Sequence, residues 1–192
     1  MDAKYFFSLE AELKNRGLDS DLDSFDVIKR RLVTHEKFNA DEFARQAIYV
    51  VLASGFSQKT AKKKHTEIMA ALRDGAGANE LMSIFGNVNK VTAIIKLWNG
   101  RQVYRDDYYT LETLDEKLSF LSKLPHVGKI TRDHFARNLG ENVFKRDVWI
   151  ERLLQKYGKN LFDKLEKETG FPRGYIDVIL WKACQNGIIK FD

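Results

Sequence analysis

The chain has 192 residues, 44% of them hydrophobic, and its 32 Lys and Arg against 27 Asp and Glu give a formal net charge of +5. This composition excludes a globally disordered chain and predicts one compact domain or two packed lobes. A single cysteine, Cys184, excludes an intramolecular disulfide framework and a four-cysteine cluster. No stretch reaches the roughly 20 apolar residues that a membrane span needs. We therefore expect a soluble protein of a reducing, intracellular compartment.

Helical periodicity runs through most of the chain, which contains only two prolines, Pro125 and Pro172. Between residues 41 and 54 the apolar side chains recur at steps of three and four, the period of one helix face. Similar patterns mark further segments, and Gly86 and Gly140 are expected to end two of them. The predicted helices cover residues 41–54, 59–72, 79–85 with Asn79 as the cap, 90–98 or on to 104, 113–121, a segment that ends before 140, 148–156, 159–167 and 173–185.

The stretch 124–131, Leu-Pro-His-Val-Gly-Lys-Ile-Thr, has the signature of a hairpin between two helices. Pro125 closes the first helix, and Gly128 is expected to supply the tight turn. The backbone N–H groups that open the second helix then point outward. Such groups bind a phosphate without reading the base sequence. A plain turn between two helices is the alternative, so this motif alone leaves nucleic-acid binding open.

A second motif follows the hairpin after one short helix. Asp147 stands at the start of a predicted helix, and residues 147–153 read Asp-Val-Trp-Ile-Glu-Arg-Leu. A Leu-Pro-x-Val-Gly hairpin followed at this distance by such an Asp resembles the helix-hairpin-helix base-excision DNA glycosylases, the superfamily of endonuclease III. The upstream segments 42–55 and 84–95 are also similar to that superfamily. The resemblance therefore spans residues 28–160.

The resemblance implies a chemical role for Asp147. In that family the corresponding carboxylate lies beside the sugar of a nucleotide turned out of the duplex. Breaking the N-glycosidic bond develops positive charge on the deoxyribose, which a fixed anion stabilises. Asp is also a favoured N-cap residue, and both roles can hold together. The implied reaction is removal of a damaged or mismatched base from duplex DNA in base-excision repair, in the cytoplasm or nucleoid.

One position departs from the strand-cutting members of that family. They carry a Lys two residues after the hairpin glycine, and this chain has Ile130 there. Lys129 lies one residue earlier, which is about 100° away around a helix. The departure favours a monofunctional enzyme, which removes the base with water as the nucleophile and does not cut the strand. In the alternative, Lys129 is the nucleophile and forms a Schiff base. A non-catalytic helix-hairpin-helix DNA-binding module and a helical protein unrelated to nucleic acid also remain open.

Basic and aromatic residues around the two motifs are the candidate DNA contacts. The loop before residue 59 corresponds to a family loop that reaches toward DNA, so Phe56 or Gln58 could fill the gap of a flipped base, although Phe56 could equally belong to the core. Trp149 could stack on that base or pack in the core. The candidate DNA-binding residues are Lys123, Leu124, Pro125, His126, Val127, Gly128, Ile130, Thr131, Arg132, Gln58 and Lys59, and the candidate base-pocket residues are Phe56 and Trp149.

The expected fold is the all-α, two-lobed fold that the resemblance implies. Residues 28–143 would form one helical lobe, which contains the hairpin at 113–140. Residues 1–27 and 144–192 would together form the second lobe. The DNA cleft would lie between the two lobes. The expected partner is duplex DNA with a lesion or mismatch, and the expected state is a monomer without membrane contact. No metal or iron–sulfur cofactor is expected, since His35 and His65 lack partners at ligand spacing. Some hairpins of this family hold a structural monovalent cation.

The last segment, residues 176–190, is similar to the tail of the small archaeal-type 8-oxoguanine glycosylases, whose C-terminus helps to hold the base. It could equally be a packed helix followed by an edge tail. The identity of the excised base therefore stays open at this point, with 8-oxoguanine and alkylated purines as equal candidates.

Overall fold

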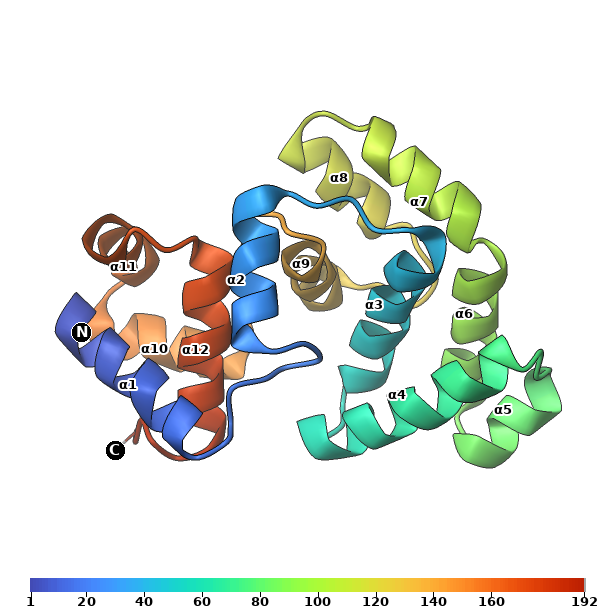
Figure 1. Ribbon diagram of the computed structural model, residues 1–192, viewed down its shortest axis with the longest axis horizontal. Coiled ribbons are helices and arrows are strands. Elements are labelled where there is room, and N and C mark those ends of the chain that lie inside the picture. The colour runs from blue at the N-terminus through green and yellow to red at the C-terminus, as the bar shows by residue number, and fades with distance from the viewer. Residues whose placement is uncertain (192) are drawn as a thin grey trace. The chain divides into compact units, whose positions relative to one another are not determined.

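The computed structural model describes residues 1–191 and consists of helices joined by short connections (Figure 1). An isolated bridge between Ser20 and Ser24 is the one β-type pairing in that range. The predicted all-α class is confirmed. The helices are α1 (Ala3–Asn15), α2 (Phe25–Thr34), α3 (Ala40–Ala53), α4 (Gln58–Arg73), α5 (Ala78–Ile84), α6 (Val88–Asn99), α7 (Arg101–Thr110), α8 (Leu114–Leu121), α9 (Lys129–Asn138), α10 (Val148–Tyr157), α11 (Leu161–Thr169) and α12 (Arg173–Gln185).

Most predicted helices have a counterpart in the structure. Those expected within residues 41–98 correspond to α3, α4, α5 and α6, and those expected within 148–185 correspond to α10, α11 and α12. The expected cap Asn79 is wrong, because Gly77 precedes α5 and Asn79 lies inside that helix. Gly100 ends α6, and the chain continues as the separate helix α7. Helices α1, α2 and α7 are not among the predicted segments.

Helix α12 is the centre of a first compact unit, which joins Met1–Glu36 to the chain from Gly140 onward. Its residues are buried around nearly the whole helix, as expected of a helix with neighbours on several sides. Helices α1, α2, α10 and α11 pack against it, so the blue N-terminal and orange to red C-terminal helices lie together in Figure 1. Phe25 of α2 meets Tyr175 of α12 edge to face, with 6.4 Å between the ring centroids.

The boundaries of this unit differ from those expected for the lobes. They fall at residues 36/37 and 139/140, whereas the expected positions are 27/28 and 143/144. Helix α2 accounts for the first difference, because Phe25, Ile28 and Leu32 are buried in the same apolar cluster as α12. Periodicity shows that such a helix has an apolar face, but it does not show which neighbour covers that face.

Helix α3 is the centre of the second unit, Lys37–Leu139. Helices α4, α6, α7 and α9 pack against it. The ring of Phe43 contacts Tyr108 and Phe135 at centroid distances of 5.6 and 5.1 Å, which ties α7 and α9 to α3. The second hairpin helix, α9, therefore rests on a packed core. None of the helices within residues 1–191 combines the length and the apolar character that crossing a membrane requires.

Candidate active site

The hairpin motif forms the turn between α8 and α9 of the second unit. Leu124 and Val127 are buried beneath the turn, and the Val127 N–H donates to the Leu124 carbonyl at 3.1 Å. His126 has φ of 61°, in the left-handed region, whereas Gly128 has φ of −88° and ψ of −179°. The prediction that Gly128 supplies the tight turn is therefore wrong. The left-handed turn residue is His126, and Gly128 has an extended backbone that any residue can adopt.

Gly128 is the exposed N-cap residue of α9, and it offers no side chain to cap the helix. Within residues 1–191, no acceptor is hydrogen-bonded to the amides of Lys129, Ile130 and Thr131. A Cβ added at Gly128 would meet no atom within 4 Å, so internal packing does not require a glycine there. A cavity of about 410 Å³ lies beside this helix start, lined by Ser54, Leu124, His126, Val127, Gly128 and Thr131. The open helix start and the cavity leave room for an anion.

The predicted DNA-contact residues differ in how far an external ligand can reach them. Leu124 and Val127 are buried and support the turn from below. Arg132 forms an ion pair with Asp133, with 2.7 Å between nitrogen and oxygen, so part of its charge is already compensated. The exposed or half-buried candidates are Lys123, Pro125, His126, Gly128, Lys129, Ile130, Thr131, Arg132, Phe56, Gln58 and Lys59.

The loop between α3 and α4 presents Phe56, which is 44% exposed and is not a core residue. Its ring meets Phe85 edge to face at a centroid distance of 5.4 Å. The Lys90 ammonium lies 5.0 Å from the centroid of the Phe56 ring and donates to the backbone carbonyl of Ser54. Lys90 itself is buried, and this burial lowers the pKa of its ammonium group. Ser54 also lines the cavity beside the hairpin, so Lys90 links the loop to that cavity.

Replacing Lys90 with Met is expected to loosen the 54–58 loop without weakening the core. Met has a similar length but cannot donate to the Ser54 carbonyl, so amide hydrogen exchange in the loop should accelerate by about tenfold. The free energy of unfolding should not fall, because the substitution removes a buried charge. Hydrogen exchange followed by NMR and urea unfolding measure the two effects. Lys96→Met, at an exposed position of α6, is the matched control.

The pH dependence of stability gives a second test of Lys90. Its pKa in the folded chain lies below the ordinary value of 10.5, so the unfolded chain binds this proton more tightly. Stability therefore rises with pH between the folded and unfolded pKa values, and the Met variant should lack this contribution. A variant that loses stability while its loop exchanges at the wild-type rate would contradict the assigned role.

Asp147 is the N-cap residue of α10 in the first unit. Its Oδ1 accepts hydrogen bonds from the N–H groups of Trp149 at 3.0 Å and Ile150 at 3.2 Å. Its Oδ2 lies 2.9 Å from the Lys145 Nζ, and the side chain is 16% exposed. One carboxylate oxygen is thus fixed by the helix start, and the other pairs with the Lys145 amine. The helix cap fixes the orientation of the carboxylate, which a catalytic anion also requires.

Lys145 is the neighbour of Asp147 that sequence reasoning did not single out. Its backbone N–H donates to the Asp177 Oδ2 at 3.1 Å, and its Nζ lies 5.1 Å from the centroid of the Trp181 ring. Both partners belong to α12, so the central helix of the unit fixes the segment that precedes α10. The backbone turns between the two residues, because the Asp147 N–H donates to the Lys145 carbonyl at 3.0 Å. The sequence carries no signal for this turn.

Cys184 is buried close to the Asp147 carboxylate. Burial raises the pKa of the thiol to about 12, and the charge of Asp147 contributes to the same shift. The thiol therefore stays protonated at neutral pH and is not a nucleophile here. In the part of the chain that the structure describes, no three His, Cys, Asp or Glu side chains are placed to hold a metal ion. The monovalent cation at the hairpin stays a prediction.

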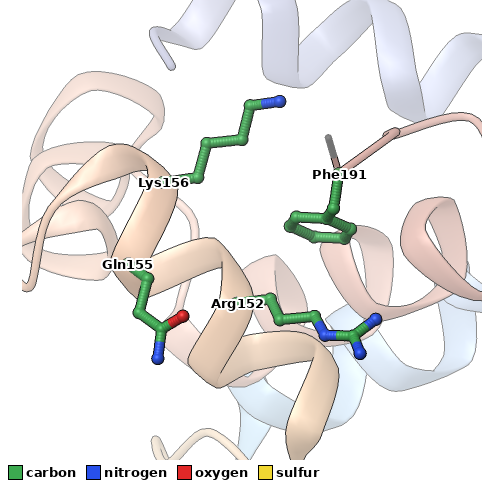
Figure 2. A pocket seen from close by; sticks show the side chains of 4 residues that line it. All are labelled: Arg152, Gln155, Lys156 and Phe191. Carbon is green, nitrogen blue, oxygen red and sulfur yellow. The ribbon is translucent and has the colours of Figure 1, made fainter.

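Trp149 packs against the apolar core of the first unit, which favours the core alternative over a free stacking surface. The Arg152 guanidinium lies 5.3 Å from its ring centroid, and the Phe191 centroid lies 6.2 Å away. A cavity of about 620 Å³ beside these groups is lined by Arg152, Gln155, Lys156 and Phe191. Figure 2 shows Arg152 and Lys156 on either side of the Phe191 ring. An aromatic ring and two cations thus border the cavity next to Trp149.

Comparison with known proteins finds no matching family model and no matching curated protein. Solved structures do match. The structure of Methanocaldococcus jannaschii 8-oxoguanine glycosylase/lyase with a 15mer DNA containing 8-oxoguanine has a TM-score of 0.68 and 17% identity, covering 95% of this chain and 98% of that chain. The structure of 8-oxoguanine DNA glycosylase from the same organism has a TM-score of 0.68 and 18% identity, covering 96% and 94%. The chain therefore has the helix-hairpin-helix DNA glycosylase fold, as the resemblance of its motifs implied.

Proposed function

We propose that this protein is a DNA glycosylase that removes a damaged or mismatched base from duplex DNA by hydrolysis of the N-glycosidic bond. The observation that carries the proposal is Asp147, a largely buried carboxylate whose orientation is fixed by two backbone N–H groups. The chain that holds it also has a hairpin helix, α9, that begins without a side-chain cap. Together these features supply a phosphate site and a sugar-directed anion on a glycosylase fold.

The hairpin binds the DNA backbone in this proposal. The amides of Lys129, Ile130 and Thr131 donate to one phosphate, and the side chains of Lys123 and Lys129 add positive charge beside it. The contact reads no base edge, so affinity should depend weakly on sequence and strongly on salt concentration. Gly128 keeps the approach open because it places no Cβ between the phosphate and the amides.

Asp147 stabilises the reacting sugar. As the bond between C1′ and the base lengthens, positive charge develops on the deoxyribose, and the Asp147 carboxylate lowers the energy of that state. A water molecule adds to C1′, its proton passes to the carboxylate, and the base leaves. The target nucleotide has to leave the helical stack first, because the bond is inaccessible inside the duplex. The product of this step is an abasic site in a strand that is still intact.

Water is the proposed attacking group because the hairpin places no amine at the position used by strand-cutting relatives. Ile130, which occupies that position, has an apolar side chain that is 51% exposed. Lys129 is the first residue of α9 and is also exposed. A covalent reaction through Lys129 remains the second route, and it would release base and cut the strand in one coupled sequence.

A panel of lesion-containing duplexes tests the proposal. Duplexes with 8-oxoguanine come first, because both matching structures are 8-oxoguanine glycosylases, followed by uracil, hypoxanthine, alkylated adenine and a mismatch. Mass spectrometry measures the released base, and alkali converts the abasic product into a strand break. We expect free base to appear before the strand is cut. Duplex binding without base release from any lesion would favour the non-catalytic binding module. Equal rates of release and cutting that depend on Lys129 would favour the covalent route.

A further inference from the structure

The Lys145 side chain places a primary amine in direct contact with the candidate catalytic carboxylate. Its Nζ lies 2.9 Å from the Asp147 Oδ2, and its side chain is 15% exposed. The aromatic ring of Trp181 lies 5.1 Å from the same nitrogen, and the Lys145 backbone is tied to Asp177 of α12. A sugar atom that reaches Asp147 therefore also comes within reach of the Lys145 amine.

A lysine that only neutralised Asp147 would oppose base excision. Positive charge develops on the sugar beside this carboxylate, and an ammonium group at 2.9 Å cancels part of the field that stabilises it. Hydration of the two charged groups does not explain the ion pair either, because both side chains are largely buried. The amine does not oppose the reaction if it acts as a nucleophile after the base has left. At that stage no further positive charge needs to develop on the sugar ring.

We propose that Lys145 is the nucleophile of a second activity, an abasic-site lyase that acts on the product of base excision. This inference rests on the proposed function only in that Asp147 receives the sugar. It differs from the covalent route through Lys129, because the amine comes from the segment that precedes α10 and not from the hairpin. Ile130 stands in the hairpin where strand-cutting members of the family carry a lysine. Lys145 would supply the missing amine from the segment that precedes α10.

The reaction balances without a cofactor. The Lys145 ammonium first passes one proton to the Asp147 carboxylate. The free amine then adds to the C1′ aldehyde of the ring-opened abasic sugar, and with the return of that proton one water molecule leaves and a protonated C=N bond forms. The Asp147 carboxylate then takes a proton from C2′, the C3′–O bond breaks, and the electron pair leaves on the 3′ phosphate. Water finally hydrolyses the C=N bond and returns the amine. Lysine is suited to the first step because its amine forms Schiff bases with carbonyl carbons.

Borohydride trapping on a preformed abasic duplex tests the inference. A uracil-containing duplex treated with a uracil-excising enzyme and then purified provides this substrate, so the outcome does not depend on base excision by this protein. Sodium borohydride reduces the C=N bond and leaves a stable link between DNA and protein. The variants are Lys145→Met, which removes the amine and the charge, and Lys145→Arg, which keeps a cation beside Asp147 but lacks a primary amine. Lys129→Met tests the hairpin amine.

We expect trapping and alkali-independent strand cleavage by the wild type, with at least a 100-fold loss in both Lys145 variants. Lys129→Met should bind the duplex more weakly, because it loses a charge beside the phosphate, but it should still form the trapped complex at saturating protein concentration. Peptide mapping of the trapped complex should find the modification on Lys145. Rescue of cleavage by Arg would overturn the proposal, because it would show that only the charge matters. Trapping through Lys129, or no trapping by a wild type that binds the abasic duplex, would also overturn it. Failure of the lesion panel with successful trapping would instead reject base excision and leave the lyase assignment standing.

Discussion

Replacing Asp147 with Asn is expected to lower the rate constant for base excision by about 100- to 1,000-fold, the loss typical of removing one fixed electrostatic group from a transition state. The amide keeps an oxygen that can accept from the N–H groups of Trp149 and Ile150, and Asn is as good an N-cap residue as Asp. The fold and the hairpin should therefore be unchanged. The variant loses the negative charge beside the sugar, the group that accepts a proton from water, and the ion pair with Lys145.

Single-turnover excision of the best lesion of the panel measures this effect, with enzyme in excess so that product release does not limit the rate. Affinity for the same duplex should change by less than about twofold, since no phosphate contact is removed. Asp74→Asn is the matched control, because Asp74 is an exposed carboxylate at the end of α4 in the other unit. If the Asp147 variant excises the base at the wild-type rate, this residue acts only as a helix cap and has no catalytic role.

The helices that sequence reasoning predicts are those whose apolar residues repeat clearly or whose ends carry strong signals. The helix found as α3 is expected because its apolar side chains follow the helical period closely, and it is the centre of its unit. Helix α1 is not among the predicted segments, although Phe6, Leu9 and Leu13 have the same spacing and are fully buried. Helix α7 is mostly polar and buries Tyr108 alone, so its pattern is weak. Which helices gather around α12 depends on packing between distant segments, which periodicity does not encode.

The sequence predicts those parts of the candidate site that depend on the type and position of a single residue. It does not predict the parts that depend on backbone conformation. Asp147 stands at a helix start in the sequence, and the structure places it there as the cap. The left-handed turn at His126 was not predictable, because glycine is the usual residue at such positions and Gly128 lies nearby. Lys145 is not among the candidate residues of the sequence analysis. Its pairing with Asp147 depends on the turn in which the Asp147 N–H donates to the Lys145 carbonyl, and that turn is visible only in the structure.

Replacing Gly128 with Ala is expected to weaken duplex binding at least tenfold while leaving the fold intact. The backbone of Gly128 is extended, and a Cβ there would meet no protein atom within 4 Å, so the variant carries no steric strain. The added methyl group would stand at the opening to the first amides of α9, where the phosphate has to approach. Loss of this contact should also make log Kd less steeply dependent on log salt concentration, because fewer counterions are released on binding.

Gly77→Ala is a closely matched control for this experiment. Gly77 is also an exposed N-cap residue, its φ of −90° and ψ of −174° nearly equal those of Gly128, and its Cβ would likewise meet nothing within 4 Å. Both substitutions replace glycine by the poorer cap alanine, so both should cost a similar free energy of unfolding, within about 1 kcal/mol. Fluorescence anisotropy measures the Kd of each variant for an abasic duplex at several salt concentrations. A difference between the two variants then reflects where the added methyl group stands and not the loss of a glycine cap. Equal affinity of the two variants would exclude the start of α9 as the phosphate site, whereas a loss confined to Gly128→Ala would mean that this glycine is needed for an external ligand and not for folding.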